Sequence, residues 1–270
     1  MVEGGALLRF ALLLPALAER GHEIHVTFES ANAWRRPAPE TLRPPPARSL
    51  RLVEELSERH PGIHHDLAPR RDPADGWTDV AWLVRGLSDL AHNAHPRYSD
   101  APALRRRARK AIVPAVESET EFEPLARRVA GRIARRLTGD TDLGRSRRVL
   151  RLTRRLEDAI PPSREVTAYL RRLKPDVVIA TGAVRFVSPE IELLKAARAA
   201  GIPTGVFVTS WDNLTNKGSL KFVPDRLFVW NDVQSRDAVE LHDIPADRLR
   251  ATGAHVFDEW FERRPSGAGV

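Results

Sequence analysis

The sequence predicts an α/β protein whose sheet is parallel and covered by helices on both faces. Residues 174–261 alternate short apolar runs with helical patterns, which is typical of strands connected by crossover helices. The runs are too uniformly apolar for one face to lie in water, which favours a parallel sheet over an antiparallel one. Hydrophobic residues make up 42% of the chain and charged residues 29%, a balance that excludes a wholly disordered protein.

Length and composition exclude several other classes. The 270 residues are enough for one large domain or two small ones with a real core. The chain has no cysteine, so disulfide scaffolds, thiolate zinc sites and cysteine nucleophiles are ruled out. No uninterrupted apolar run approaches the ~20 residues that a membrane span needs. With 43 Lys and Arg against 36 Asp and Glu, the net charge is +7.

The first stretch, residues 1–70, begins with an apolar segment from Ala6 to Ala18. Its apolar residues recur at helical spacing and Gly21 follows as a stop, so we expect one helix. A signal peptide is the alternative, but Glu3 and Arg9 do not fit its charge pattern. Three further elements are expected here: a strand at Glu23–Phe28, a proline-rich loop at Pro37–Pro46 and a strand at Ile63–Leu67.

The middle stretch, about residues 77–173, is expected to be an Arg-rich helical insertion. Its apolar residues fall three or four apart, as Val149, Leu152 and Leu156 do. Paired arginines concentrate positive charge here, which would suit nucleic acid. However, acidic residues are interleaved with the arginines, and no aromatic stacking platform interrupts them. We therefore expect a solvated helix surface rather than a nucleic-acid interface.

The third stretch supplies the strands of the predicted sheet. Pro175 stops a helix, and the continuous apolar run after it fits a strand buried on both faces. Gly201 closes an amphipathic helix before the next apolar run. The expected elements are strands at 176–181, 204–209, 226–230 and 249–252, with helices at 190–200 and 233–242.

Ligands of open parallel α/β sheets bind beyond the carboxyl ends of the strands, so we expect the functional residues there. The segment 210–218 places a carboxylate, amides, hydroxyls, an amine and an indole at one such end, which suits a sugar or polyol. Asp212 is the candidate catalytic residue, as the base for an acceptor proton. The expected substrate-binding residues are Ser210, Trp211, Asn213, Thr215, Lys217, Gly218, Gly182, Asn231 and Gly253.

Structural roles stay open for several of these residues. Asp212 or Asn213 could cap a short helix, and Trp211 could belong to the core. Gly182 and Gly253 could serve only the turns that follow their strands. The histidines match no metal-ligand spacing and no phosphate-binding glycine fingerprint is present, so neither a metal nor a bound cofactor is expected.

Several segments resemble GT-B glycosyltransferases, in particular their amino-terminal, acceptor-side domain. Residues 17–24 (LAERGHEI) are similar to the first helix and second strand of that family. Residues 173–178 (LKPDVV) and 199–203 (AAGIP) resemble later strand entries of the same domain. Residues 213–217 with 223–229 resemble the acceptor-side loop of the peptidoglycan N-acetylglucosamine transferase. Residues 210–213 (SWDN), together with 224–226 (PDR) and 230–231 (WN), resemble a bacterial branch of surface-polysaccharide transferases.

The resemblance implies a Rossmann-like domain over residues 1–262, with a tail or linker start at 263–270. It also implies that the family's central first strand is missing, and that the second domain with the nucleotide-sugar site is absent from the chain. The implied reaction transfers a sugar from a nucleotide-diphosphate donor to a hydroxyl acceptor, either a glycan or a lipid-linked molecule. We expect this chain by itself to be inactive.

The implied location is the cytoplasm, with peripheral association at the inner membrane surface left open. Two rival functions remain. One is a nucleotide-sugar 2-epimerase, which shares the fold. The other is a non-catalytic module that binds carbohydrate or nucleic acid, and only phosphate contacts would make its affinity fall steeply with salt.

Overall fold

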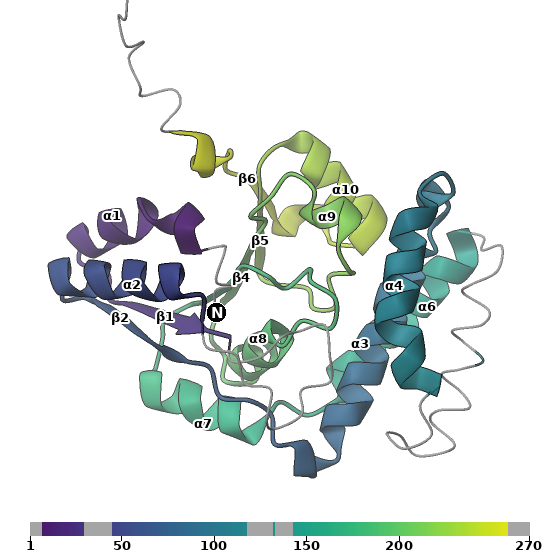
Figure 1. Cartoon of the computed structure of the whole chain (residues 1–270), viewed down its shortest axis with the longest axis horizontal. Helices are drawn as coiled ribbons and strands as arrows, with labels where there is room; N and C mark the ends of the chain where they lie inside the picture. The colour runs from purple at the N-terminus through teal and green to yellow at the C-terminus, as the bar shows by residue number, and fades with distance from the viewer. Residues whose placement is uncertain (1–6, 30–44, 118–131, 133–142, 259–270) are drawn as a thin grey trace, which may run out of the picture.

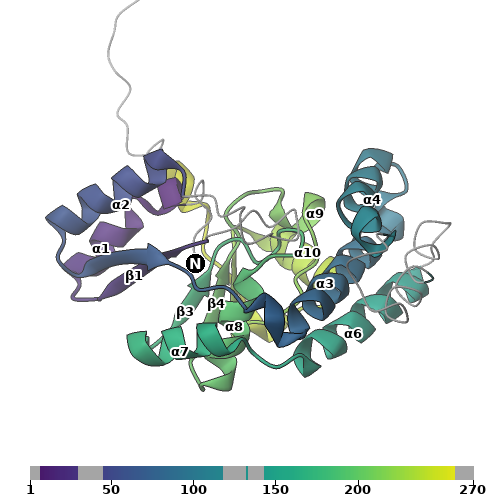
Figure 2. The same ribbon diagram turned by 60° about the horizontal axis from the view of Figure 1, so that its bottom comes forward.

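The computed structural model describes residues 7–29, 45–117, 132 and 143–258. Its elements form a two-stranded unit with its helices, a four-stranded sheet with its own helices, and a layer of long helices (Figure 1). The two-stranded unit and the long helices lie at opposite ends of the molecule, with the four-stranded sheet between them (Figures 1 and 2).

The two-stranded unit contains both strands that the sequence predicts in the first stretch. β1 (Ile24–Phe28) and β2 (Ile63–Leu67) are parallel, with Ile24 opposite Ile63. α2 (Ala47–Arg59), which the sequence analysis missed, connects them and buries Val53 and Leu56 against the strands. Most of the expected proline-rich loop lies outside the described residues.

The expected single helix at the start of the chain is wrong, because two short helices stand in its place. η1 (Leu7–Phe10) is a 3-10 helix and α1 (Leu13–Glu19) is an α-helix. Pro15 is the third residue of α1, and proline is tolerated only in the first turn of a helix. The α-helix therefore begins just before Pro15 rather than running through it.

The four-stranded sheet confirms the predicted neighbours and their parallel direction. The strand order is β3-β4-β5-β6 and all three pairings are parallel. α7 leads into the first strand, and α8 and α10 connect later ones. The bounds are β3 Val178–Ala180, β4 Thr204–Phe207, β5 Arg226–Val229, β6 Leu249–Ala251, α7 Arg164–Leu173, α8 Glu190–Ala199 and α10 Asp232–His242.

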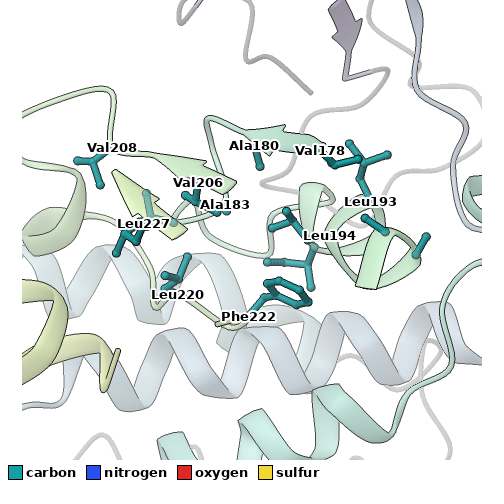
Figure 3. Close-up of a cluster of buried hydrophobic side chains, with 14 of the residues drawn as sticks. Val178, Ala180, Ala183, Leu193, Leu194, Val206, Val208, Leu220, Phe222 and Leu227 are labelled. Carbon is teal, nitrogen blue, oxygen red and sulfur yellow. The ribbon is translucent and has the colours of Figure 1, made fainter. Parts of the chain in front are cut away.

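One face of this sheet forms the main core. Side chains such as Val206 and Leu227 point from the strands toward Leu194 of α8 and toward Phe222 (Figure 3). All four of these side chains are buried. Burial of a side chain of this size stabilises the fold by about 1.5–3 kcal/mol.

The opposite face is covered more thinly than the sequence predicts. Phe207 and Phe228 stack there with ring centroids 4.4 Å apart, and Phe10 of η1 meets Phe207 edge-on at 5.7 Å. Ile179 on the same face keeps 39% of its surface exposed. The described part of the chain thus places an α-helical layer on one face and the short η1 on the other.

The middle stretch is helical wherever the structure describes it, as expected. α3 (Trp77–Asn93) is the central helix, and every residue from Ala81 to Asn93 is buried. It packs against α4 (Pro102–Glu117) and α6 (Leu143–Ala159). Most of residues 118–142 lie outside the description. None of the described helices is long and apolar enough to span a bilayer.

Buried charges tie the long helices to the sheet. Arg85 of α3 donates to Glu157 of α6 from Nε at 2.9 Å and from Nη2 at 2.7 Å, and it also pairs with Glu192 of α8. Lys195 Nζ donates to Glu157 Oε1 at 3.0 Å. Burial alone would raise the pKa of Glu157, but Arg85 and Lys195 outweigh it and hold that pKa at about 2. The network therefore keeps its charges at neutral pH.

Candidate functional site

The segment 209–218 lies at the carboxyl end of β4, where the sequence analysis expects a site. It contains the single-turn helix α9 (Asn213–Asn216). Asn213 is buried, and its Oδ1 accepts hydrogen bonds from Thr209 N at 3.0 Å and Thr209 Oγ1 at 3.1 Å. The Asn213 side chain therefore connects the loop to the end of β4, and its Oδ1 is occupied by these two hydrogen bonds rather than open to a ligand.

Asp212 stands at the N-cap position of α9, but its side chain does not cap the helix. Its carboxylate accepts a hydrogen bond from the amide of Asn216 instead. Partial burial would raise the pKa of Asp212, but hydrogen bonds from Ser210 and Asn216 and the charge of Lys217 outweigh it and lower that pKa. Asp212 is thus a half-buried carboxylate that is ionised at neutral pH.

The groups on either side of Asp212 differ in exposure. Trp211 is 73% exposed, so it belongs to the surface and not to the core. Lys217 is half-buried, and the described residues supply no ion pair for its ammonium group. Thr215 Oγ1 donates to the carbonyl of Asp212 at 3.3 Å. An indole face, a carboxylate and an ammonium group therefore lie within seven residues of one loop.

Gln234 joins the loop after β4 to the loop after β5. Its Nε2 donates to the carbonyls of Ser210 at 3.2 Å and Trp211 at 3.3 Å, and its Oε1 accepts from Trp230 N at 2.8 Å. Asn231 Oδ1 in turn accepts from Gln234 N at 3.0 Å, which makes Asn231 the N-cap of α10. Asn231 therefore lies near the loop 209–218, and its side chain caps α10.

Gly218 and Gly182 lie in tightly packed backbone. Gly218 N donates to Val184 O at 2.8 Å, which joins the loop to the turn after β3. A Cβ at Gly218 would lie 2.2 Å from Asp89 Oδ1, and one at Gly182 would lie 2.6 Å from Arg185 Nε. Gly218 therefore requires glycine for packing, because Asp89 is held in place by Ser219 and Lys221, whereas a Cβ at Gly182 would meet only the end of a flexible arginine side chain.

Gly253 differs from the other two glycines of the predicted site. It is exposed, its φ is +82°, and no atom within 4 Å would meet a Cβ there. That φ lies in the left-handed region, so glycine suits the turn after β6. No hydrogen bond within the described ranges connects Gly253 to the loop 209–218.

Sequence reasoning missed a cluster that joins the carboxyl ends of the two sheets. Arg185, in the turn after β3, pairs with Glu29, the residue after β1, and lies 3.9 Å from Glu190. Glu190 Oε2 also accepts from Gly182 N at 2.7 Å. Of these two turns, only the one after β3 is among the strand ends where we expect functional residues, and nothing in the spacing of these residues indicates that they meet.

A buried ion pair between Asp89 and Lys221 lies next to the end of the loop 209–218. Asp89 of α3 accepts from Lys221 Nζ at 2.6 Å, Ser219 N at 2.8 Å and Val187 N at 3.0 Å. Val187 has φ +49°, a conformation that strains a β-branched residue by about 1–3 kcal/mol. Because Asp89 holds Val187 and Ser219 together, it sets the spacing between the turn after β3 and the end of the loop.

Two further features bear on ligand binding. No group of three or more potential metal ligands occurs among the residues that the structure describes. An open depression lies between α10 and β6, lined by Asp232, Arg236, Glu240 and Leu249 among others, and none of the predicted site residues lines it.

No family model, curated protein or solved structure matches the chain.

Proposed function

We propose that this chain is the acceptor-side domain of a GT-B-type sugar transferase. Such an enzyme moves a sugar from a nucleotide-diphosphate donor to a hydroxyl group of an acceptor. The observation that carries the proposal is that ionised Asp212 directly follows Trp211, whose indole is exposed, at the carboxyl end of β4. Open parallel sheets bind their ligands at this edge, which supports an acceptor site there.

The chemistry of the loop fits a hydroxyl acceptor. The indole of Trp211 offers an apolar face to a sugar ring, and the Asp212 carboxylate accepts a hydrogen bond from the attacking hydroxyl. The acceptor oxygen bonds to the anomeric carbon, its proton passes to Asp212, and the nucleoside diphosphate leaves with the electrons of its bond to the sugar. Lys217 would hold phosphate or acceptor oxygens. The donor site belongs to a second domain.

One observation favours a second candidate, a non-catalytic carbohydrate-binding module. A general base works best when its pKa lies near the operating pH, and the pKa of Asp212 is lowered. Asp212 also already accepts a hydrogen bond from Asn216. A module that only binds needs the hydrogen-bond acceptor and the indole, and it has no need of a strong base.

The decisive experiment measures sugar transfer with a panel of nucleotide sugars and glycan acceptors. It uses the gene product with any coding sequence that flanks this chain. Asp212→Asn should lower kcat by roughly two to four powers of ten, the usual contribution of a general base. Asp247→Asn, an exposed carboxylate in the 3-10 helix before β6, is the matched control and should leave kcat unchanged.

The same assay on residues 1–270 alone tests the domain assignment. We expect acceptor binding without turnover, because much of the rate comes from holding both substrates in one geometry. Turnover by this chain alone would show that it is complete. An unchanged kcat in Asp212→Asn would remove Asp212 from the reaction and favour the binding module.

Acceptor binding is tested separately through Trp211. Trp211→Ala should weaken binding of the glycan acceptor, because the indole face is lost. Trp77→Ala, which removes an exposed indole from the start of α3, is the matched control and should bind as the unmodified chain does. Equal losses in both variants would contradict the placement of the acceptor on this loop.

A further inference from the structure

The outer face of α6 carries an unusual combination of side chains. Residues four apart are neighbours on the surface of a helix, so a series with this spacing forms a row along it. One row is Arg147, Arg151 and Arg155, and the next row is Arg148, Leu152 and Leu156. All six side chains are exposed, and the two leucines keep 48% and 44% of their surface accessible.

The orientation of this face is set by what lies behind it. On the inner side of α6, Ser146 Oγ donates to the carbonyl of Ala91 in α3 at 2.7 Å. Glu157, on the same inner side, pairs with Arg85 of α3. These contacts hold α6 against α3, so the arginine and leucine rows point away from the protein. α6 lies at one edge of the molecule in both views (Figures 1 and 2).

No acidic side chain among the described residues neutralises the positive charge of this face. Within the part of the chain that the structure describes, Arg147, Arg148, Arg151 and Arg155 form no ion pair. The nearby acidic residue of the same helix, Asp158, lies 3.6 Å from Arg198 of α8. Within the described ranges the face therefore carries four positive charges without an acidic partner, around two exposed leucines.

We infer that the outer face of α6 binds the surface of an anionic lipid bilayer. A helix that presents apolar side chains among basic ones lies in the bilayer interface, with its apolar groups at the acyl boundary and its arginines at the phosphates. Arginine side chains suit this depth, because their stems cover apolar surface while the guanidinium groups stay in water. This surface is separate from the loop 209–218, so the inference does not depend on the proposed function.

A nucleic acid would account for the arginines but not for the leucines. Binding to single strands relies on aromatic side chains that stack on bases, and the two rows contain none. Binding to a duplex relies on phosphate contacts, to which exposed leucines add nothing. The charge and the apolar surface together favour the bilayer.

The test is flotation of the full chain with lipid vesicles. We expect binding to phosphatidylcholine vesicles that contain phosphatidylglycerol and little binding to phosphatidylcholine alone. Each basic residue at an anionic surface contributes roughly fivefold to affinity, so Arg151→Gln with Arg155→Gln should weaken binding about 30-fold. The matched control is Arg51→Gln with Arg59→Gln, two exposed arginines of α2 at the other end of the molecule, and it should lose far less.

A third variant tests the contribution of the two leucines, and binding of duplex DNA tests the nucleic-acid alternative. Leu152→Ser with Leu156→Ser keeps every charge, and we expect it to weaken vesicle binding several-fold. Since all these side chains are exposed, far-UV circular dichroism should be unchanged in each variant. Equal losses in the α6 and α2 variants would overturn the inference. Wild-type binding by the leucine variant, with duplex DNA bound through the same arginines, would assign the face to nucleic acid instead.

Discussion

The imidazole rings of His92 and His242 stack with their centroids 4.6 Å apart, where α3 meets α10. Both side chains are buried. His242 Nδ1 accepts from Leu220 N at 3.0 Å, so its Nε2 carries the proton and donates to the carbonyl of Leu214 at 2.8 Å. His92 Nε2 accepts a hydrogen bond from the hydroxyl of Tyr98 at 3.2 Å. Both rings are therefore held in their neutral form.

The free energy of unfolding should fall as the pH drops below about 6.5. Burial lowers the pKa of His242 to about 4, and burial next to His242 lowers that of His92. In the unfolded chain both groups bind protons near pH 6.5, whereas the folded chain does not until a much lower pH. Because the unfolded state binds more protons in this window, stability is present above pH 6.5 and is lost as the pH falls toward 4.

Urea unfolding at pH 7 and pH 5 measures this loss. We expect a decrease of about 2 kcal/mol from His242 and a further decrease from His92. His242→Gln should be less stable at pH 7 but should lose less on acidification. His64→Gln, at an exposed histidine of β2, should keep the full pH dependence. The same slope in His242→Gln as in the unmodified chain would contradict this assignment.

Glu157→Gln should be strongly destabilising. The change leaves Arg85 and Lys195 buried with one anion fewer, and breaking a buried ion pair costs about 3–5 kcal/mol. Glu240→Gln is the control, since Glu240 is exposed and lies 3.9 Å from Arg97 at the surface, where such pairs contribute about 0–1 kcal/mol. Urea unfolding at pH 7 measures the free energy of unfolding of both variants. Similar decreases in the two would show that the buried ion pairs of Glu157 contribute no more than a surface pair.

Gly218→Ala should destabilise the fold because the new methyl group has no room. Its Cβ would lie 2.2 Å from Asp89 Oδ1, and Asp89 is fixed by Lys221 and Ser219. Overpacking of this kind costs about 1–3 kcal/mol. Gly62→Ala is the control, because the nearest atom there is 3.4 Å away. Thermal unfolding compares the two, and equal midpoints would mean that Asp89 can move aside.

Asn231→Ala should cost about 1 kcal/mol of stability through the loss of the N-cap of α10. Asn231→Ser should restore most of it, because serine also caps. The comparison separates a capping role from ligand binding. If Asn231→Ser keeps its stability but loses acceptor affinity, Asn231 contacts the ligand as well.

The order and the type of most elements follow from the sequence, because they depend on neighbours along the chain. Every strand expected in residues 174–261 is present, with ends within two residues of the predicted ones. Local patterns also explain the failures. Val53 and Leu56 have the helical spacing of α2, and Pro15 marks the first turn of α1 and so separates it from η1. The loop 209–218 lies at the carboxyl end of β4, as the strand-end rule predicts, and the structure adds its contacts with Val184 and Gln234.

What the residues of that loop do was decided by the tertiary structure. The side-chain oxygens of Asn213 and Asn231 accept hydrogen bonds from backbone N–H groups. Gly218 has no room for a side chain because Asp89, which lies 129 positions earlier in the chain, packs against it. The pairing of Arg85 with Glu157, 72 residues away, and the stack of His92 on His242 left no pattern in the sequence. Periodicity reports which face of an element is buried. It does not report which buried groups meet, because those contacts depend on how distant elements pack together.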